Sequence, residues 1–158
     1  MLGNILMNNP KMLVDRTALK MNRKRAVDSG GYFLHELAIS EVKDRLCNIN
    51  RDFQSIAIVT GLSTIWRKAF PSATVIEDSE NLNLKRGKYD LVIHGMALHW
   101  ANDPVGQLIQ LRLALTGDGL MIAVCLGGTT LNELRDVLIE AETTLSGGIH
   151  PRLSLIHI

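Results

Sequence analysis

This sequence has two cysteines and almost no net charge, and each of these shortages excludes a class of protein. Its 17 basic and 16 acidic residues leave a formal net charge of +1, so the whole-chain field gives no reason to expect nucleic acid or an anionic membrane as a partner. Cys47 and Cys125 cannot build a disulfide framework, and we interpret both as buried hydrophobic residues in a reducing compartment. The remaining composition is that of one ordinary globular domain of 158 residues.

Metal-binding motifs and long apolar runs are also missing. The five histidines have no HExxH spacing and no CxxC accompanies them, so we expect no metal. The longest apolar run, residues 120–126, is far shorter than the roughly 18 residues that indicate a membrane span. Residues 1–11 hold no continuous apolar segment of a secretory signal, and we favour a cytoplasmic location. A mitochondrial transit segment is the weaker alternative, because residues 1–14 carry no acid but also no arginine.

Helical signals occur at four places along the chain. The first helix is expected over residues 15–27, with Asp15 as its cap and Ser29-Gly30-Gly31 as its end. The second covers residues 33–48. Its core-facing stripe is Leu34, Leu37, Ala38, Val42 and Leu46.

Two further helices have explicit start signals. Asp103-Pro104 begins the third helix, which Gly117 stops. Thr130-Leu-Asn-Glu133 is a capping box that begins the fourth. Four apolar side chains of the fourth helix are expected to face inward: Leu134, Val137, Leu138 and Ala141.

Between these helices lie short runs that are apolar on both faces, typical of strands in a parallel sheet covered on both sides. They occupy residues 55–60, 73–76, 89–94 and 120–126. The alternation of such runs with helices predicts an α/β fold. We expect a Rossmann-like open, mainly parallel sheet with helices on both faces, preceded by two N-terminal helices.

A short basic cluster stands on the first helix: Lys20, Arg23, Lys24 and Arg25. We interpret it as a solvated helix face, with a phosphate-binding patch as the alternative. Ligands of open parallel sheets bind beyond the carboxyl ends of the strands. The segments that follow the four runs are therefore the ones to inspect: residues 60–64, 77–79, 95–102 and 127–130.

Five stretches carry a resemblance to a known family. They are YDLVI at 89–93, ALHWANDP at 97–104, LRLALTGDGLMIAVCLGG at 111–128, TLNELR at 130–135 and AETTLSGGIHPRLS at 141–154. The sequence resembles class I S-adenosylmethionine-dependent methyltransferases of the type 11 kind. The similar branch contains the biotin-synthesis malonyl-carrier methyltransferase and the complex I assembly methyltransferase-like proteins.

The resemblance implies a division of the chain. We expect an N-terminal extension over residues 1–13 and a methyltransferase-like domain over residues 14–154 that is incomplete at its C-terminus. Residues 155–158 do not resemble the family, which suggests a truncated product.

The resemblance also implies a site for S-adenosylmethionine. The turn at Gly61 and the loop with Gly95 and Met96 would contact the cofactor. Asp78 would be the adenine-side acid if residues 73–76 form the family's third strand, whereas Glu77 would be the ribose-binding acid if they form the second. The sequence leaves both alternatives open.

The glycine-rich turn of the family is reduced here to Val59-Thr-Gly-Leu-Ser-Thr64. Only Gly61 is kept, and the side chains of Leu62 and Ser63 would occupy space that the cofactor uses. Ser63 or Thr64 would cap the following helix.

His99 and Trp100 match the family's LHW motif and are the candidates for the catalytic pocket. A structural role is the alternative, in which Trp100 packs under the loop and His99 satisfies a backbone group. Methyl transfer from a sulfonium depends chiefly on alignment and charge complementarity, so a catalytic base is not obligatory. His94 is expected to be structural.

Two functions remain from the sequence. One is a methyltransferase that acts on a small-molecule, carrier-bound or protein acceptor. The other is a non-catalytic protein of the same fold with an eroded cofactor turn, which serves a protein partner as an assembly or interaction factor.

Overall fold

Four apolar runs pair as parallel strands in the order β2-β1-β3-β4. The computed structural model describes residues 12–147. The strands are β1 (Ile56–Thr60), β2 (Thr74–Glu77), β3 (Tyr89–Gly95) and β4 (Leu115–Val124). Central β1 and β3 are almost wholly buried, as their continuous apolar sequences require. The predicted α/β fold with a parallel sheet is confirmed.

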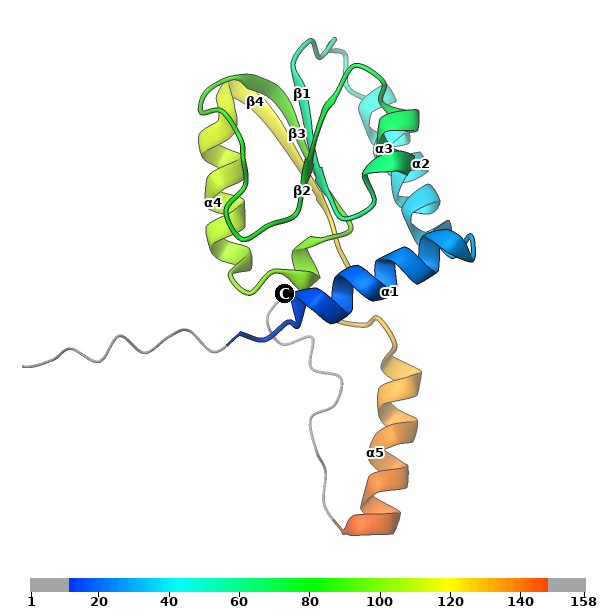
Figure 1. Cartoon of the computed structure of the whole chain (residues 1–158). Helices are drawn as coiled ribbons and strands as arrows, with labels where there is room; N and C mark the ends of the chain where they lie inside the picture. The colour runs from blue at the N-terminus through cyan, green and yellow to red at the C-terminus, as the bar shows by residue number, and fades with distance from the viewer. Residues whose placement is uncertain (1–11, 148–158) are drawn as a thin grey trace, which may run out of the picture.

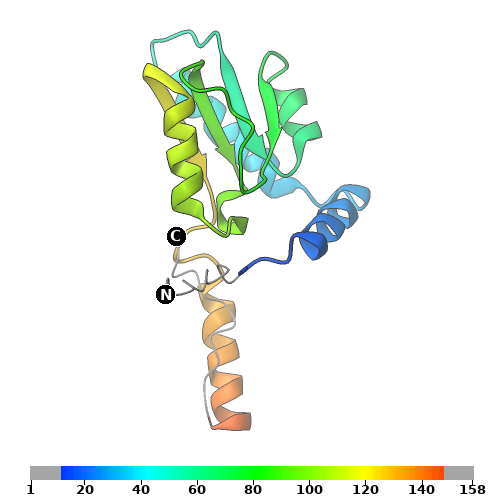
Figure 2. The same cartoon turned by 60° about the vertical axis from the view of Figure 1, so that its left-hand side comes forward.

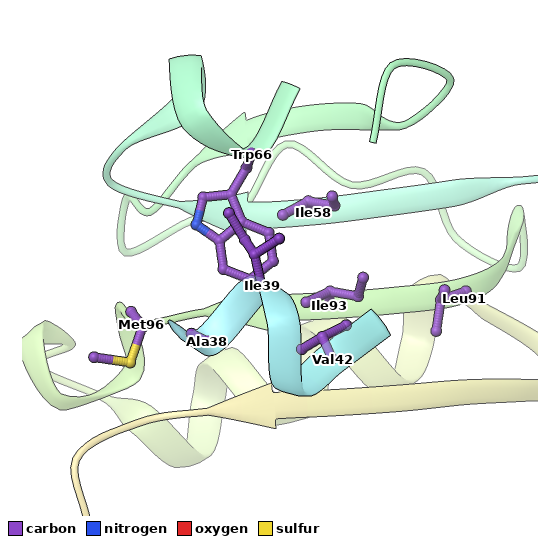
Figure 3. Packing of buried hydrophobic residues seen from close by; sticks show 8 residues of the cluster. All are labelled: Ala38, Ile39, Val42, Ile58, Trp66, Leu91, Ile93 and Met96. Atoms are coloured by element: carbon purple, nitrogen blue, oxygen red, sulfur yellow. The ribbon is translucent and has the colours of Figure 1, made fainter. Parts of the chain in front are cut away.

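Helices cover both faces of this sheet (Figure 1). One face carries α2 (Phe33–Cys47) and α3 (Ser63–Ala69), and the other carries α4 (Pro104–Ala114). On the first face, Trp66 of α3 packs with Val42 of α2 and with Ile58 and Ile93 of the sheet (Figure 3). Alternate strand residues point to the second face, where they meet Leu111 of α4. This two-sided core fixes the strand ends on which a site can be built.

Helix α1 (Arg16–Asp28) lies across the carboxyl ends of the strands rather than on a face of the sheet (Figures 1 and 2). It begins where the sequence predicts, because the Asp15 carboxylate accepts hydrogen bonds from the backbone N–H groups of Thr17 and Ala18. Leu19 is its one buried residue. Helix α1 is therefore a cover over the end of the sheet.

In dinucleotide-binding folds the second strand lies beside the first, and the third strand lies beyond the second. Strand β2 has the position of the second strand, because it lies directly beside β1. It pairs with β1, from Ala57 opposite Thr74 to Thr60 opposite Glu77. Within residues 12–147, no strand pairs with the outer edge of β2. The position favours the alternative in which residues 73–76 are the second strand and Glu77 is the acid that ends it.

Two predicted boundaries are wrong. Gly117 does not stop α4, which ends at Ala114, because the backbone from Leu115 onward already pairs with β3 through an irregular register. The 3-10 helix η1 (Leu98–Trp100) precedes α4, and the Asp103 carboxylate caps α4 as expected by accepting from the Gly106 N–H. The capping box at Thr130 does not form, since a turn carries the chain to Leu131.

Helix α5 (Asn132–Ser146) extends away from the sheet and has no buried residue (Figure 1). The prediction that its apolar stripe faces the core is therefore wrong for this structure: Leu134 and Val137 are exposed. Its N-cap residue Leu131 adopts a left-handed backbone with φ of 57°, and no side chain caps the helix. Residues 125–146 lead away from β4 without turning back onto the sheet (Figure 1).

Several burial predictions also fail. Cys47 is exposed and Cys125 is half-buried, so neither is a fully buried hydrophobic residue. On α2, Leu34 and Leu37 are exposed, and Ile39 joins Ala38 and Val42 in the core instead. The face of α2 that contacts the core therefore differs from the apolar stripe predicted from the sequence. No helix in residues 12–147 is both long and apolar enough to cross a membrane.

Candidate cofactor site

A cavity of about 900 Å³ opens at the carboxyl ends of β1 and β2, beneath α1. Its walls come from α1 and the start of α2, from the turn after β1 at residues 61–65, and from the segment after β2 at residues 77–80. This is the edge where open parallel sheets bind their ligands. Three of the predicted site residues line it: Gly61, Glu77 and Asp78.

The turn at Gly61 leads directly from β1 into α3. The Leu62 N–H donates to the Thr60 hydroxyl over 3.3 Å, and the Leu62 side chain is buried. Leu62 is the N-cap residue of α3 without a side-chain hydrogen bond, so the predicted cap by Ser63 or Thr64 is wrong. The atoms nearest to a Cβ placed on Gly61 all belong to the Arg23 guanidinium, which such a Cβ would overlap. The space against the glycine is filled by Arg23 of α1.

Arg23 is held there by Asp78. Its Nη1 and Nη2 each donate to one carboxylate oxygen of Asp78 over 2.7 Å. Asp78 is only 2% exposed, and Arg16 of α1 adds a contact of 3.4 Å to the same carboxylate. Two guanidinium groups thus compensate the charge of one buried acid. The interpretation of the basic cluster as a solvated face is wrong for Arg23.

A second acid extends this network toward the LHWAND segment. Arg16 Nη2 lies 2.7 Å from Glu80 Oε1, and the Asn102 side-chain amide donates to the same oxygen over 2.8 Å. Burial opposes the ionisation of Glu80, but hydrogen bonds from Arg16 and Asn102 outweigh it and lower its pKa. The side-chain oxygen of Asn102, Oδ1, also accepts from the backbone N–H groups of Leu13 and Val14. The beginning of α1 is therefore tied to the end of the sheet.

Sequence reasoning missed Arg16 and Arg23 as site residues. A signal was present, because positions seven apart lie on one face of a helix and Leu19 stands between them on that face. The sequence did not show that this face of α1 lies over Asp78.

Glu77 closes β2 and is exposed at the cavity wall. It makes no ion pair with any residue that the structure describes. Its carboxylate can accept hydrogen bonds from ligand hydroxyl groups without first losing an intramolecular partner.

Gly95 and Met96 lie outside the cavity wall. A Cβ on Gly95 would stand 2.5 Å from Trp66 Cζ2 and 2.6 Å from Cε2, so the indole packs directly on this glycine. Met96 is buried in the same cluster (Figure 3) and has a left-handed backbone with φ of 55°. Both residues belong to the core beside the site in this arrangement.

His99 and Trp100 form η1, also outside the cavity wall, with ring centroids 5.2 Å apart. Burial, reinforced by the Arg23 charge, lowers the pKa of His99 to about 4, so the ring is neutral near pH 7. Its Nδ1 is buried and has no hydrogen-bond partner among the described residues. Trp100 is 40% exposed. The structural alternative, with a satisfied His99 and a packed Trp100, does not describe this geometry.

His94 at the end of β3 has a partner that fixes its tautomer. Gln107 donates its Nε2 to the Ser79 carbonyl over 3.0 Å, which turns its Oε1 toward His94 Nε2 at 2.9 Å. His94 Nε2 therefore carries the proton, and the buried Nδ1 is an acceptor without a donor. Burial lowers the pKa of His94, and its bonding to α4 agrees with the expected structural role.

Known proteins resemble this chain over part of its length. It is 37% identical over 106 residues to the mitochondrial arginine-hydroxylase NDUFAF5 of Homo sapiens, covering 67% of this chain and 31% of that protein. It is 37% identical over 78 residues to the malonyl-[acyl-carrier protein] O-methyltransferase of Laribacter hongkongensis, covering 49% of this chain and 25% of the relative. The chain thus spans about a third or less of the length of these relatives.

A solved structure shares the fold. A SAM-dependent methyltransferase of Thermotoga maritima superposes with a TM-score of 0.50 at 17% identity, over 74% of this chain and 67% of that one. No protein-family profile matches the sequence.

Proposed function

Because the chain belongs to the class I methyltransferase family, we propose that its cavity at β1 and β2 holds S-adenosylmethionine. When bound, this cofactor would supply a sulfonium methyl group for transfer to a small-molecule, carrier-bound or protein acceptor. The observation that carries the proposal is a cavity at the carboxyl edge of a parallel sheet that brings together Gly61, Glu77 and Asp78.

The residues present fit the cofactor in three respects. A cavity of about 900 Å³ falls within the range of roughly 300 to 1,000 Å³ for small-molecule sites. Gly61 has no side chain to hinder the approach of a ligand. The exposed Glu77 carboxylate ends β2, where acids bind ribose hydroxyls in dinucleotide sites. The Arg23 guanidinium against Gly61 is an obstacle that the cofactor would have to displace.

His99 and Trp100 remain candidates for the acceptor side of the site. The neutral His99 ring, with an unpartnered Nδ1, could accept a hydrogen bond from an acceptor group. Exposed Trp100 offers an aromatic surface next to it. A pKa of about 4 makes His99 a weak base at neutral pH, so we assign it orientation of the acceptor rather than proton removal.

A specific observation favours a second function. Arg23 already occupies both carboxylate oxygens of Asp78 and the space against Gly61. A non-catalytic assembly or interaction factor with an eroded cofactor pocket would have such an arrangement. The names of the relatives describe two activities, arginine hydroxylation and O-methylation, so they do not choose the reaction.

Calorimetric titration of the full chain with S-adenosylhomocysteine tests the proposal. We expect saturable binding that weakens about tenfold in Glu77→Gln, the loss of roughly 1.4 kcal/mol that removal of a hydrogen-bonded charge produces. Glu133→Gln is the control, since Glu133 lies on α5 and does not line the cavity. Absence of binding in protein with an intact circular-dichroism spectrum would favour the non-catalytic function.

Two further predictions are also proposals. One is a cytoplasmic location, although the name of the human relative places that protein in mitochondria. The division into residues 1–13, 14–154 and 155–158 is another, and residues 1–11 and 148–158 lie outside the described part.

A further inference from the structure

We propose that α1 is a displaceable latch, in which Arg23 occupies the place beside Gly61 and Asp78 that a bound ligand must take. The inference rests on the proposed function in one respect, namely that the ligand is an adenosyl cofactor. The latch itself depends only on contacts within the chain. It predicts that the cavity binds ligand only after the Arg23 guanidinium has left.

The first support is that Arg23 and a ligand would need the same space. The guanidinium lies so close to Gly61 that even one added methyl group would overlap it. The same guanidinium uses both oxygens of Asp78. A ligand that approached the glycine and the acid would meet Arg23 at both points.

The second support is that α1 is attached by charges rather than by apolar packing. Leu19 is its one buried residue, while the apolar side chains of Met21 and Val27 are exposed. Release of the helix would thus expose little new apolar surface. Because such exposure costs about 25 cal/mol per Å², its contribution to the free energy of release is small. Segments with few buried apolar contacts open at low free energy.

The third support is the placement of the two arginines. Arg16 and Arg23 both contact Asp78, so a group that replaced Arg23 at this acid would also weaken the second attachment. Arg16 would keep its partner Glu80. Beyond the other end of α1, Gly30 has φ of 70°, a conformation suited to a hinge without side-chain strain.

Asp78 also restricts the ligands that can open the latch. The acid is buried, so loss of both arginines without replacement would leave an uncompensated charge. The replacing ligand must therefore present a cation or several hydrogen-bond donors to Asp78. Adenosyl cofactors carry an ammonium group and ribose hydroxyls, which satisfy this requirement.

Hydrogen exchange of the α1 amides in the full chain tests the latch without any ligand. In Arg23→Gln we expect α1 to exchange at least tenfold faster, while β1 and β3 keep their protection. Lys24→Gln is the matched control, because Lys24 is the next residue on the helix and forms no ion pair with any described residue. The double variant Arg23→Gln with Asp78→Asn removes both charges and is the safeguard if the single variant does not fold.

Titration with S-adenosylhomocysteine then tests the competition. We expect about tenfold tighter binding to Arg23→Gln than to the unaltered chain. We also expect added salt to strengthen binding only where the ion pair is present, because salt screens the pair.

The outcomes separate the latch from the proposed function. Unchanged exchange in both the single and the double variant overturns the latch, whether or not the cofactor binds. Faster exchange without any binding supports the latch and overturns the proposed cofactor. Weaker binding in Arg23→Gln would make Arg23 a ligand contact and overturn the latch.

Discussion

Gly61 and Gly95 stand at corresponding points of two adjacent strands, Gly61 one residue beyond the end of β1 and Gly95 at the end of β3. At each of them an added Cβ would collide with a neighbouring side chain. At Gly61 the neighbour is the far end of Arg23, a long side chain from a helix with one buried residue. At Gly95 it is the indole of Trp66, which is fully buried between α2 and the sheet.

This difference divides the strand edge into an open half at Gly61, after β1, and a closed half at Gly95, at the end of β3. The indole cannot leave Gly95 without disrupting the core, whereas the guanidinium can leave Gly61 by rotating about its side-chain bonds. A ligand that needs bare backbone at a strand end therefore has access at β1 and not at β3. This is why we centre the site on Gly61 and the β2 acids.

The largest expected effect is on the closed half. Trp66→Ala should lower the free energy of unfolding by about 3–5 kcal/mol, the usual cost of removing a large buried aromatic side chain. It would also leave His35 Nδ1 without the indole N–H that it accepts over 3.1 Å. Urea unfolding followed by circular dichroism measures this. Trp100→Ala is the control, and equal losses in the two variants would contradict the buried position of Trp66.

Next, Gly95→Ala should cost about 1–3 kcal/mol, because the added methyl group overpacks the indole. Gly127→Ala, at a glycine with nothing within 4 Å of the added carbon, should be close to neutral. Thermal unfolding of the two variants compares them. A neutral Gly95→Ala would mean that Trp66 moves as easily as Arg23.

Acid should destabilise the protein through His99, which lies in η1 after β3. Its pKa is about 4 in the folded state against 6.5 when free, so below pH 6.5 the unfolded chain takes up a proton that the folded chain refuses. The stability that the neutral ring provides is complete above pH 6.5 and is lost as the pH falls toward 4.

After a discount for the partial exposure of the ring, we expect His99 to account for about 1–2 kcal/mol. Unfolding midpoints between pH 4.5 and 7.5 should fall less steeply in His99→Gln than in the unaltered chain. Parallel curves would show that the ring titrates normally.

The smallest expected effect is on the open half. Gly61→Ala should change the free energy of unfolding by less than about 1 kcal/mol, because the flexible end of Arg23 can shift while Arg16 stays beside the buried Asp78 carboxylate. Its signature should be faster hydrogen exchange in α1 alone. A loss as large as that of Gly95→Ala would remove the distinction between the two turns.

The sequence alone determined the sheet and most helix starts, because these depend on local patterns. Runs such as residues 56–60 are apolar on both faces and suit buried parallel strands, and Asp15 and Asp103 cap their helices through neighbouring N–H groups. It also identified Gly61, Glu77 and Asp78 as neighbours at one edge. Local pattern misled at Thr130 and Gly117, where a turn and pairing with β3 overrode the capping box and the stop signal.

Only the tertiary structure decided what fills the site. Arg23 and Asp78 are 55 residues apart, and their contact depends on where α1 crosses the sheet, which no local pattern encodes. The same holds for Trp66, whose packing on Gly95 moved a predicted ligand-binding turn into the core. Charge pairs and ring contacts between distant segments follow from the packing of whole elements. In this protein that packing placed a polar network at the end of β1 and closed the end of β3 with an indole ring.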